Sequence, residues 1–174
     1  MQKKRRGVRK YLPEFVYGAI DGSVTTFAVV AGAVGATFSS AVILVLGFAN
    51  LFADGFSMAI SNYLSNKSDH EMHDGLKFEK KPVKSAIATF ISFLIIGFVP
   101  LLFFVLAIFI PSLLSHAFLF SAIFTGIAFL FVGFVKGEIT GRHKVLSALE
   151  TLLIGGIASV IAYAIGYFLE GLVG

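Results

Sequence analysis

Two aspartates and a methionine within long apolar stretches could together bind a divalent metal ion. Asp21 interrupts the first apolar run of the chain, and Asp54 and Met58 interrupt the second. An ionisable residue at the centre of a membrane span costs at least about 2.5–3.5 kcal/mol on insertion scales, so it persists where it pairs, lines a cavity or binds an ion. No Lys or Arg lies deep in any apolar run. These acids therefore predict a partner from outside the chain, either a cation or a proton.

The second apolar run carries polar groups and a thioether at every fourth position. Residues four apart lie on one face of a helix, so this face would present amide oxygens, a carboxylate and a sulfur. Carboxylates suit hard divalent cations and a thioether suits a transition metal, so the set fits Fe²⁺ or Mn²⁺ better than Mg²⁺ or Na⁺. At the rise of a helix, Asp21 lies about 10 Å and Asp54 about 15 Å from the predicted cytosolic ends of their spans. The candidate ligands are Asp21, Asp54, Met58, Asn50 and Asn62.

Structural roles for the same residues remain open. An aspartate within a span can be protonated and hydrogen-bonded to a hydroxyl group. A methionine in a span often only packs, and asparagines often join helices by hydrogen bonds. The hydroxyl groups near the two aspartates belong to Ser23, Thr25, Thr26 and Ser57.

Two weaker candidate sites lie nearer the ends of the spans. The segment SDHEMHDG at 68–75 is either a solvated polar loop or a metal-loading site at the cytosolic mouth. Its histidines are three residues apart, which is not the H-E-x-x-H spacing of zinc proteases. Glu150 lies about one turn into the last span and is a possible secondary site. The candidate loading residues are Asp69, His70, Glu71, His73 and Asp74.

These residues must be positioned by membrane-spanning helices. Of the 174 residues, 57% are apolar and 14% are charged, whereas a typical soluble domain has about 25% charged residues. This composition excludes a soluble enzyme, and the absence of cysteine excludes disulfides and thiolate metal sites. We predict an all-α integral membrane protein in which residues 1–174 form a single domain with no prosthetic group. The five predicted spans are 14–36, 41–64, 85–109, 116–136 and 145–169, with a short cytosolic loop at 65–84.

The basic residues predict the orientation of the helices. All 14 Lys and Arg residues lie in the N-terminal tail, in the loop after span two or around the loop after span four. With five spans these segments share one side, so the positive-inside rule places the N-terminus in the cytosol and the C-terminus outside or in a lumen. The same placement explains a net charge of +4 without nucleic acid. A cleaved signal peptide is disfavoured, because the first apolar run is too long.

Small residues in the first span predict close packing of helices. Gly18 and Gly22 are four residues apart, and small residues recur at Ala28, Gly32 and Ala36. Such spacing is typical of helices that dimerise in membranes. We therefore expect a homodimer that uses span one.

Two long motifs resemble the vacuolar iron transporter family. YGAIDGSVTTFAVVAGAVGA at 17–36 resembles its first-span signature, and ADGFSMAISNYLSNKSDHE at 53–71 resembles its second. The segments 81–102 and 135–166 are similar to its later spans. The resemblance implies a five-span homodimer that moves Fe²⁺ or Mn²⁺ out of the cytosol in exchange for protons. It also implies metal-binding roles for Asp21, Met58 and, less generally, Asp54.

The chain departs from that family in two respects. The large cytosolic metal-binding domain of many members is missing between spans two and three, and Asn50 and Asn62 stand where members often carry Glu. The short form resembles prokaryotic members, which favours a cell (inner) membrane, or a vacuolar-type membrane in a eukaryote. The prediction is therefore an exporter of Fe²⁺ and/or Mn²⁺ by proton antiport. The alternatives are a non-transporting membrane scaffold protein and an exporter of another cation.

Overall fold

The fold is a bundle of long apolar helices. It is known from a computed structural model that describes residues 10–72 and 80–173. Five helical segments are long and apolar enough to cross a membrane, as predicted, with α4, η1 and α5 together forming the third and η2 and α6 the fourth. The elements are α2 (Leu12–Gly35), α3 (Ser40–Met72), α4 (Pro82–Gly97), η1 (Val99–Leu101), α5 (Leu102–Phe109), η2 (Pro111–His116), α6 (Ala117–Thr140) and α7 (Lys144–Val173).

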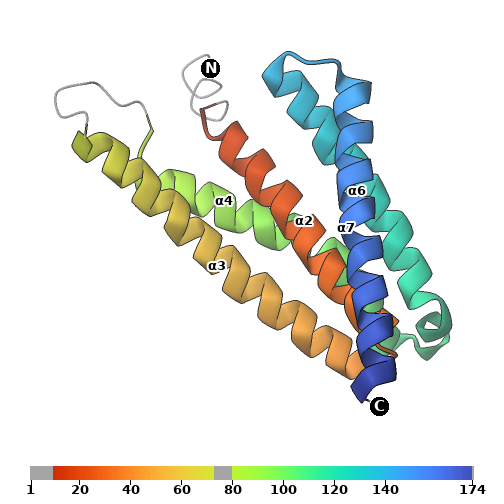
Figure 1. Cartoon of the computed structure of the whole chain (residues 1–174). Helices are drawn as coiled ribbons and strands as arrows, with labels where there is room; N and C mark the ends of the chain where they lie inside the picture. Colours follow the sequence, from red (N-terminus) through yellow and green to blue (C-terminus); the bar gives the residue numbers. More distant parts are fainter. Residues whose placement is uncertain (1–9, 73–79, 174) are drawn as a thin grey trace.

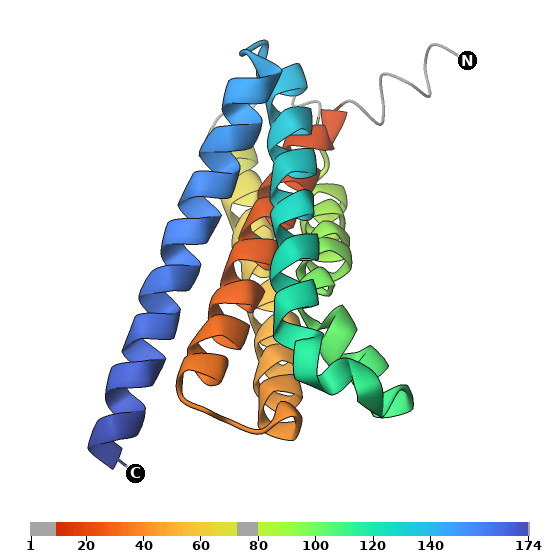
Figure 2. The same cartoon turned by 90° about the vertical axis from the view of Figure 1, so that its right-hand side faces the viewer.

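Helix α2 is the central helix of the bundle. It packs against α3 and α4 on one side and against α6 and α7 on the other, an arrangement that the two views in Figures 1 and 2 show. Its glycines allow this approach: a Cβ atom on Gly22 would lie 2.6 Å from the carbonyl oxygen of Phe93 on α4. Gly32 likewise faces the backbone of Ala162 on α7.

The predicted close approach at the small residues of α2 therefore exists, but its partners belong to the same chain. Gly18 and Gly22 are used by α4, and Gly32 and Gly35 are used by α7. These contacts within the chain account for the small residues at these four positions, and the expected homodimer through span one stays a prediction. A helix with small residues on several sides can serve as the shared centre of a bundle.

A tight turn joins α2 to α3 and makes them an antiparallel pair. The N–H of Phe38 donates to the carbonyl oxygen of Ala33 and the N–H of Thr37 to that of Val34, as in a Schellman motif. Thr37 adopts the left-handed conformation that this motif requires, with φ 55°. The polar break predicted after residue 36 is therefore a helix C-cap, and the short turn brings Asp21 and Asp54 to neighbouring helices.

Helix α3 is longer than predicted. It continues to Met72, eight residues beyond the predicted end of the span at 64. Neither Gly nor Pro occurs between 65 and 72, and the turns are supported by a bond from Asn66 Nδ2 to the carbonyl oxygen of Asn62 and by an ion pair between Lys67 and Glu71. The first part of the predicted 65–84 loop is therefore helical.

The third span is broken at Pro100. A proline lacks the N–H that a continuous helix needs, so α4 gives way to the short 3₁₀ helix η1 before α5 begins. The carbonyl oxygen of Pro100 accepts a hydrogen bond of 2.5 Å from Ser121 Oγ on α6. A neighbouring helix thus satisfies a backbone group at the break, as a membrane interior requires.

The charged residues are segregated along the bundle. All described Lys and Arg residues lie at the end of the bundle that carries the start of α2, the end of α3 and the α6–α7 turn, which is the upper end in Figure 1. Large apolar side chains of α3 and α7 are exposed along the rest of the surface, among them Phe52, Phe56, Val160 and Ile161. Such a surface is suited to contact with lipid and unsuited to water.

Candidate metal-binding site

The α2–α3 pair brings the two predicted aspartates near each other. Asp21 on α2 and Asp54 on α3 are each partly buried, and the negative charge of Asp54 acts on the carboxyl group of Asp21. Two carboxylates that repel each other in a partly buried site form a favourable place for a cation. The structure therefore brings the two aspartates near each other, and their role as metal ligands stays a prediction.

Met58 lies one helical turn beyond Asp54. It is 8% exposed and packs in the apolar core with Leu51 and Phe93. The structure therefore supports a packing role for Met58. Its thioether still lies only one helical turn from Asp54. One turn before Asp54, the side-chain nitrogen of Asn50 is buried and has no hydrogen-bond partner. An unsatisfied buried amide invites a ligand or a water molecule.

Two of the hydroxyl groups near Asp21 donate their hydrogen bonds elsewhere. Thr25 Oγ1 donates to the backbone carbonyl oxygen of Asp21 at 2.8 Å, and Ser23 Oγ donates to the backbone carbonyl oxygens of Ala19 and Ile20. Such bonds to preceding carbonyl groups are usual for Ser and Thr in helices. These two hydroxyl protons are therefore not bound to the Asp21 carboxyl group, which weakens the interpretation of Asp21 as a structurally hydrogen-bonded acid.

Asn62 has a structural role in this conformation. Its Nδ2 donates to Thr89 Oγ1 on α4 at 2.9 Å, and its Oδ1 accepts a bond of 2.5 Å from Asn66 Nδ2. Both ends of the amide are engaged, but Oδ1 accepts only one bond and keeps a second lone pair that could still bind a metal ion. The bond to Thr89 joins α3 to α4, which is the interhelical role that polar residues often have in membranes.

The predicted loading segment is only partly described. Asp69, His70 and Glu71 lie on the last turns of α3, and Glu71 forms an ion pair of 3.7 Å with Lys67. His73 and Asp74 fall outside the described residues. The loading role of these five residues stays a prediction.

Glu150 is not part of the aspartate pair. Its Oε2 accepts a hydrogen bond of 3.1 Å from Lys136 Nζ, and the two side chains join α6 to α7. The expectation that the deep acids lack a basic partner in the chain is therefore wrong for Glu150. Helix α6 extends to Thr140 and α7 begins at Lys144, so both residues lie near the turn, where charged side chains can reach water.

Glu14 is a buried acid at the start of α2 that the sequence analysis did not include among the candidate ligands. It is 7% exposed, and its Oε1 accepts hydrogen bonds from Lys80 Nζ at 2.7 Å and Ser85 Oγ at 3.4 Å. Its Oε2 has no hydrogen-bond partner. Glu14 is two helical turns before Asp21, and this spacing places both acids on one face of the helix. This spacing of seven residues between Glu14 and Asp21 could have indicated Glu14 as a further candidate ligand from the sequence.

The described residues of one chain do not supply a complete set of acidic or imidazole ligands. Among residues 10–72 and 80–173, no group of three or more His, Cys, Asp or Glu side chains could hold a metal ion. An octahedral site takes about six donor atoms. The aspartate pair therefore needs further donors, from amides, the thioether, water or another chain.

Comparison with known proteins identifies the family. The model of the VIT family matches residues 12–78 and 70–167, which together cover most of the chain. The chain belongs to the VIT family. This is a family of membrane transporters and not of enzymes.

Curated relatives support this assignment. A protein of Oryza sativa named vacuolar iron transporter 1 is 30% identical, with 86% of this chain and 82% of the relative aligned. A vacuolar iron transporter of Toxoplasma gondii is 25% identical over 94% of this chain and 76% of its own length. Vacuolar iron transporter 1 of Arabidopsis thaliana is 27% identical over 87% and 83%.

The same comparisons show that the relatives carry residues for which this chain has no counterpart. The alignments span 210 to 229 positions, more than the 174 residues of this chain. The family match also divides into two pieces that meet at residues 70–78, where α3 ends. Both findings agree with the expectation that relatives carry additional residues at the connection between α3 and α4.

Proposed function

We propose that this chain exports Fe²⁺, Mn²⁺ or both from the cytosol in exchange for protons. The observation that carries the proposal is the interaction between Asp21 and Asp54 on adjacent apolar helices, one turn from the thioether of Met58. Carboxylates with a soft donor nearby suit first-row transition metals. The names of the relatives support iron as one substrate.

Competition between metal and protons would drive the exchange. A metal ion from the cytosol compensates the negative charges of the two carboxylates. The carboxylates can therefore stay deprotonated within the membrane. Protons from the opposite side bind the same carboxylate oxygens and displace the metal. Neither ion can be bound fully while the other is present, and this competition couples their opposite movements.

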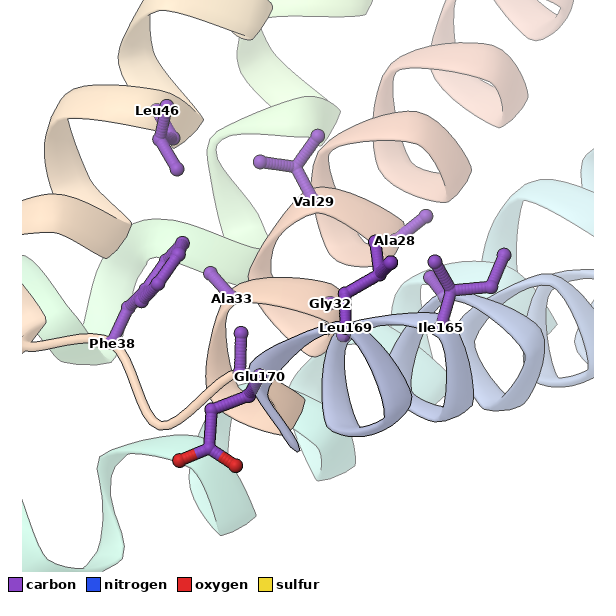
Figure 3. Close-up of a pocket in the computed structure, with 12 residues that line it drawn as sticks. Ala28, Val29, Gly32, Ala33, Phe38, Leu46, Ile165, Leu169 and Glu170 are labelled. Atoms are coloured by element: carbon purple, nitrogen blue, oxygen red, sulfur yellow. The ribbon is translucent and has the colours of Figure 1, made fainter. Parts of the chain in front are cut away.

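A homodimer would complete the site. Asp21 lies on the same strip of α2 as Tyr17 and Thr25, and this strip is not fully covered by the other helices. Nearer the α2–α3 turn, the surface is hollowed into an apolar groove of about 640 Å³ between α2, α7 and the start of α3. Figure 3 shows Gly32 and Ala33 at its floor, with Phe38 and Ile165 on opposite sides. We propose that the partner copy packs along this strip and adds its own two aspartates to the site.

The orientation follows from the charges. The end of the bundle that carries the basic residues would face the cytosol, with the N-terminus there and the C-terminus outside or in a lumen. The membrane would be the cell (inner) membrane of a prokaryote, or a vacuolar-type membrane if the source is eukaryotic. Metal would then leave the cytosol in either case.

A liposome experiment tests the proposed function. Purified protein is reconstituted under anaerobic conditions with an internal metal dye and an internal pH dye, and Fe²⁺ or Mn²⁺ is added outside. We expect metal influx with matched proton efflux, and a fall of metal flux to background in Asp54→Asn. Glu138→Gln is the matched control, because it removes one exposed carboxylate that pairs with Lys144 away from the site.

Each result of this experiment decides one part of the proposal. Normal flux in Asp54→Asn would overturn the site, and metal flux without proton movement would overturn the exchange. No flux of either metal from folded protein would favour the scaffold alternative. Equal or stronger flux of Co²⁺, Zn²⁺ or Ca²⁺ would favour an exporter of another cation.

A further inference from the structure

A polar cavity lies between α2 and α3, at the basic end of the bundle. It has a volume of about 340 Å³, which is enough for a hydrated cation because a water molecule takes about 30 Å³ of liquid. Its lining is rich in oxygen-bearing side chains, with one thioether. The lining residues are Glu14, Tyr17, Met58, Ser61, Asn62, Ser65 and Asn66.

The cavity contains a carboxylate with one oxygen that has no hydrogen-bond partner. Glu14 is more than nine-tenths buried, and its Oε2 makes no hydrogen bond. A carboxylate has about four acceptor sites on its two oxygens, whereas the bonds to Glu14 from Lys80 and Ser85 both reach Oε1. Leaving a buried charged oxygen without a partner costs free energy. The free oxygen therefore favours a second cationic or hydrogen-bonding ligand.

The cation that now balances Glu14 comes from a position that can release it. Lys80 precedes α4 and is not part of a helix, and its side chain is 38% exposed. A lysine carries its charge on a long flexible stem and is strongly hydrated. Its ammonium group can therefore leave Glu14 for water without moving the buried part of α2.

The cavity also lies near the aspartate pair along both helices. Met58 lines the cavity, and it follows Asp54 by one turn of α3. Along α2, Glu14 and Asp21 are seven residues apart, or about 10 Å at the rise of a helix. A cation at Glu14 would thus be one short step from Asp21 and Asp54.

We propose that this cavity is a separate binding subsite for a divalent transition-metal ion, in which the Lys80 ammonium group occupies the cation position until the metal displaces it. The metal would bind both oxygens of Glu14, with amide and hydroxyl oxygens from α3 as further donors. This inference rests on the proposed function in one point, which is that the ligand of the subsite is the transported metal. The Lys80 ammonium group then acts as an exchangeable counter-ion of Glu14, at the basic end of the proposed metal pathway.

Two neighbouring lysines provide the test. Mn²⁺ alone is titrated into purified protein in lipid nanodiscs, and free Mn²⁺ is measured by electron paramagnetic resonance, with Asp54→Asn present in every sample to weaken the deeper site. Lys80→Met is compared with Lys81→Met, which makes the same change in net charge at an adjacent exposed position. We expect Lys80→Met to lower the Kd for Mn²⁺ about tenfold relative to Lys81→Met, because one competing ion pair is removed.

Stability gives a second readout. Removing Lys80 leaves Glu14 as a buried charge without a cation, so Lys80→Met should have a lower Tm than Lys81→Met, and Mn²⁺ should restore it. The double variant Glu14→Gln/Lys80→Met should fold without metal and should lose both the tighter binding and the response of Tm to Mn²⁺. This variant keeps the test decisive if Lys80→Met alone folds poorly.

The outcomes separate this proposal from the proposed function. Equal Mn²⁺ affinity in Lys80→Met and Lys81→Met, or tight binding that survives Glu14→Gln, would overturn the subsite whatever the transport result. Normal transport by Asp54→Asn would overturn the deeper site and leave the comparison of the two lysine variants valid.

Discussion

Asp54 and Met58 are one helical turn apart and differ sharply in their surroundings. Asp54 is partly exposed and interacts with the charge of Asp21, whereas Met58 is packed among apolar side chains. A buried methionine can contribute volume, sulfur chemistry or both. A substitution that keeps the volume and removes the sulfur separates these two contributions.

Met58→Leu is predicted to preserve the bundle and impair iron transport. Leucine has a similar volume, so we expect a change in stability below about 1.5 kcal/mol. Loss of one soft ligand should lower the Fe²⁺ transport rate about tenfold, the equivalent of about 1.4 kcal/mol, with a smaller effect on the harder Mn²⁺. Rates are measured in the liposome assay and stability by thermal unfolding in detergent. Equal loss for both metals with a lower Tm would assign Met58 to packing alone.

Spacing in the sequence predicted that Asp54 and Met58 share one helix face, because helical periodicity is a local property. The short connection between the first two spans predicted that Asp21 lies on a neighbouring helix. These patterns did not predict the burial of Glu14, because Lys80, which follows α3, is 66 residues away in the chain. Only the folded bundle brings the two together. The pairing of Glu150 with Lys136 was missed because it depends on how α6 and α7 pack against each other, which neither apolar run specifies.

At the scale of the elements, close contact between α2 and α4 holds the site. Gly22, next to Asp21, faces the backbone of Phe93 so closely that an added Cβ atom would lie 2.9 Å from its Cα. Backbone atoms cannot yield as a flexible side chain can, so any larger residue must push the helices apart. The small residue beside Asp21 is therefore needed to set the position of its helix.

Gly22→Ala is predicted to destabilise the protein by about 1–3 kcal/mol and to reduce transport. Gly156→Ala on α7 is the matched control, because nothing lies within 4 Å of a Cβ atom placed there. Alanine is favoured over glycine in helices by about 1 kcal/mol, so this control should be neutral or slightly stabilising. Thermal unfolding in detergent compares the two variants. A Tm for Gly22→Ala equal to that of Gly156→Ala would contradict the close packing of α2 and α4.

The sequence predicted the five long helices because membrane spans are specified by apolar length, which is a local property. It predicted that the small residues of α2 pack closely but not which helices they contact. The same spacing suits a helix of the same chain or of a second copy. The far end of α3 was also missed, because polar residues 65–72 continue a helix that the hydropathy pattern ends at 64.

At the scale of the whole molecule, the distribution of charge predicts the orientation of the bundle in the membrane. All described basic residues lie at one end, which also carries the polar cavity and the Glu14–Lys80 pair. At the opposite end are η2 and the α2–α3 turn, where Thr37 Oγ1 donates to Glu170 Oε1. Each Lys or Arg near an anionic cytosolic leaflet contributes about 1 kcal/mol of attraction. The basic end should therefore face the cytosol.

Single engineered cysteines can test this orientation, since the natural chain contains none. Ser112 on η2 and His143 at the α6–α7 turn are exposed at opposite ends of the bundle. We expect a membrane-impermeant maleimide to label Ser112→Cys in intact cells and His143→Cys only after the membrane is permeabilised. The reverse pattern would place the cavity and its exchangeable lysine outside. The same bundle would then be inserted in the opposite orientation. The proposed export from the cytosol would be wrong even if Asp54 were essential for transport.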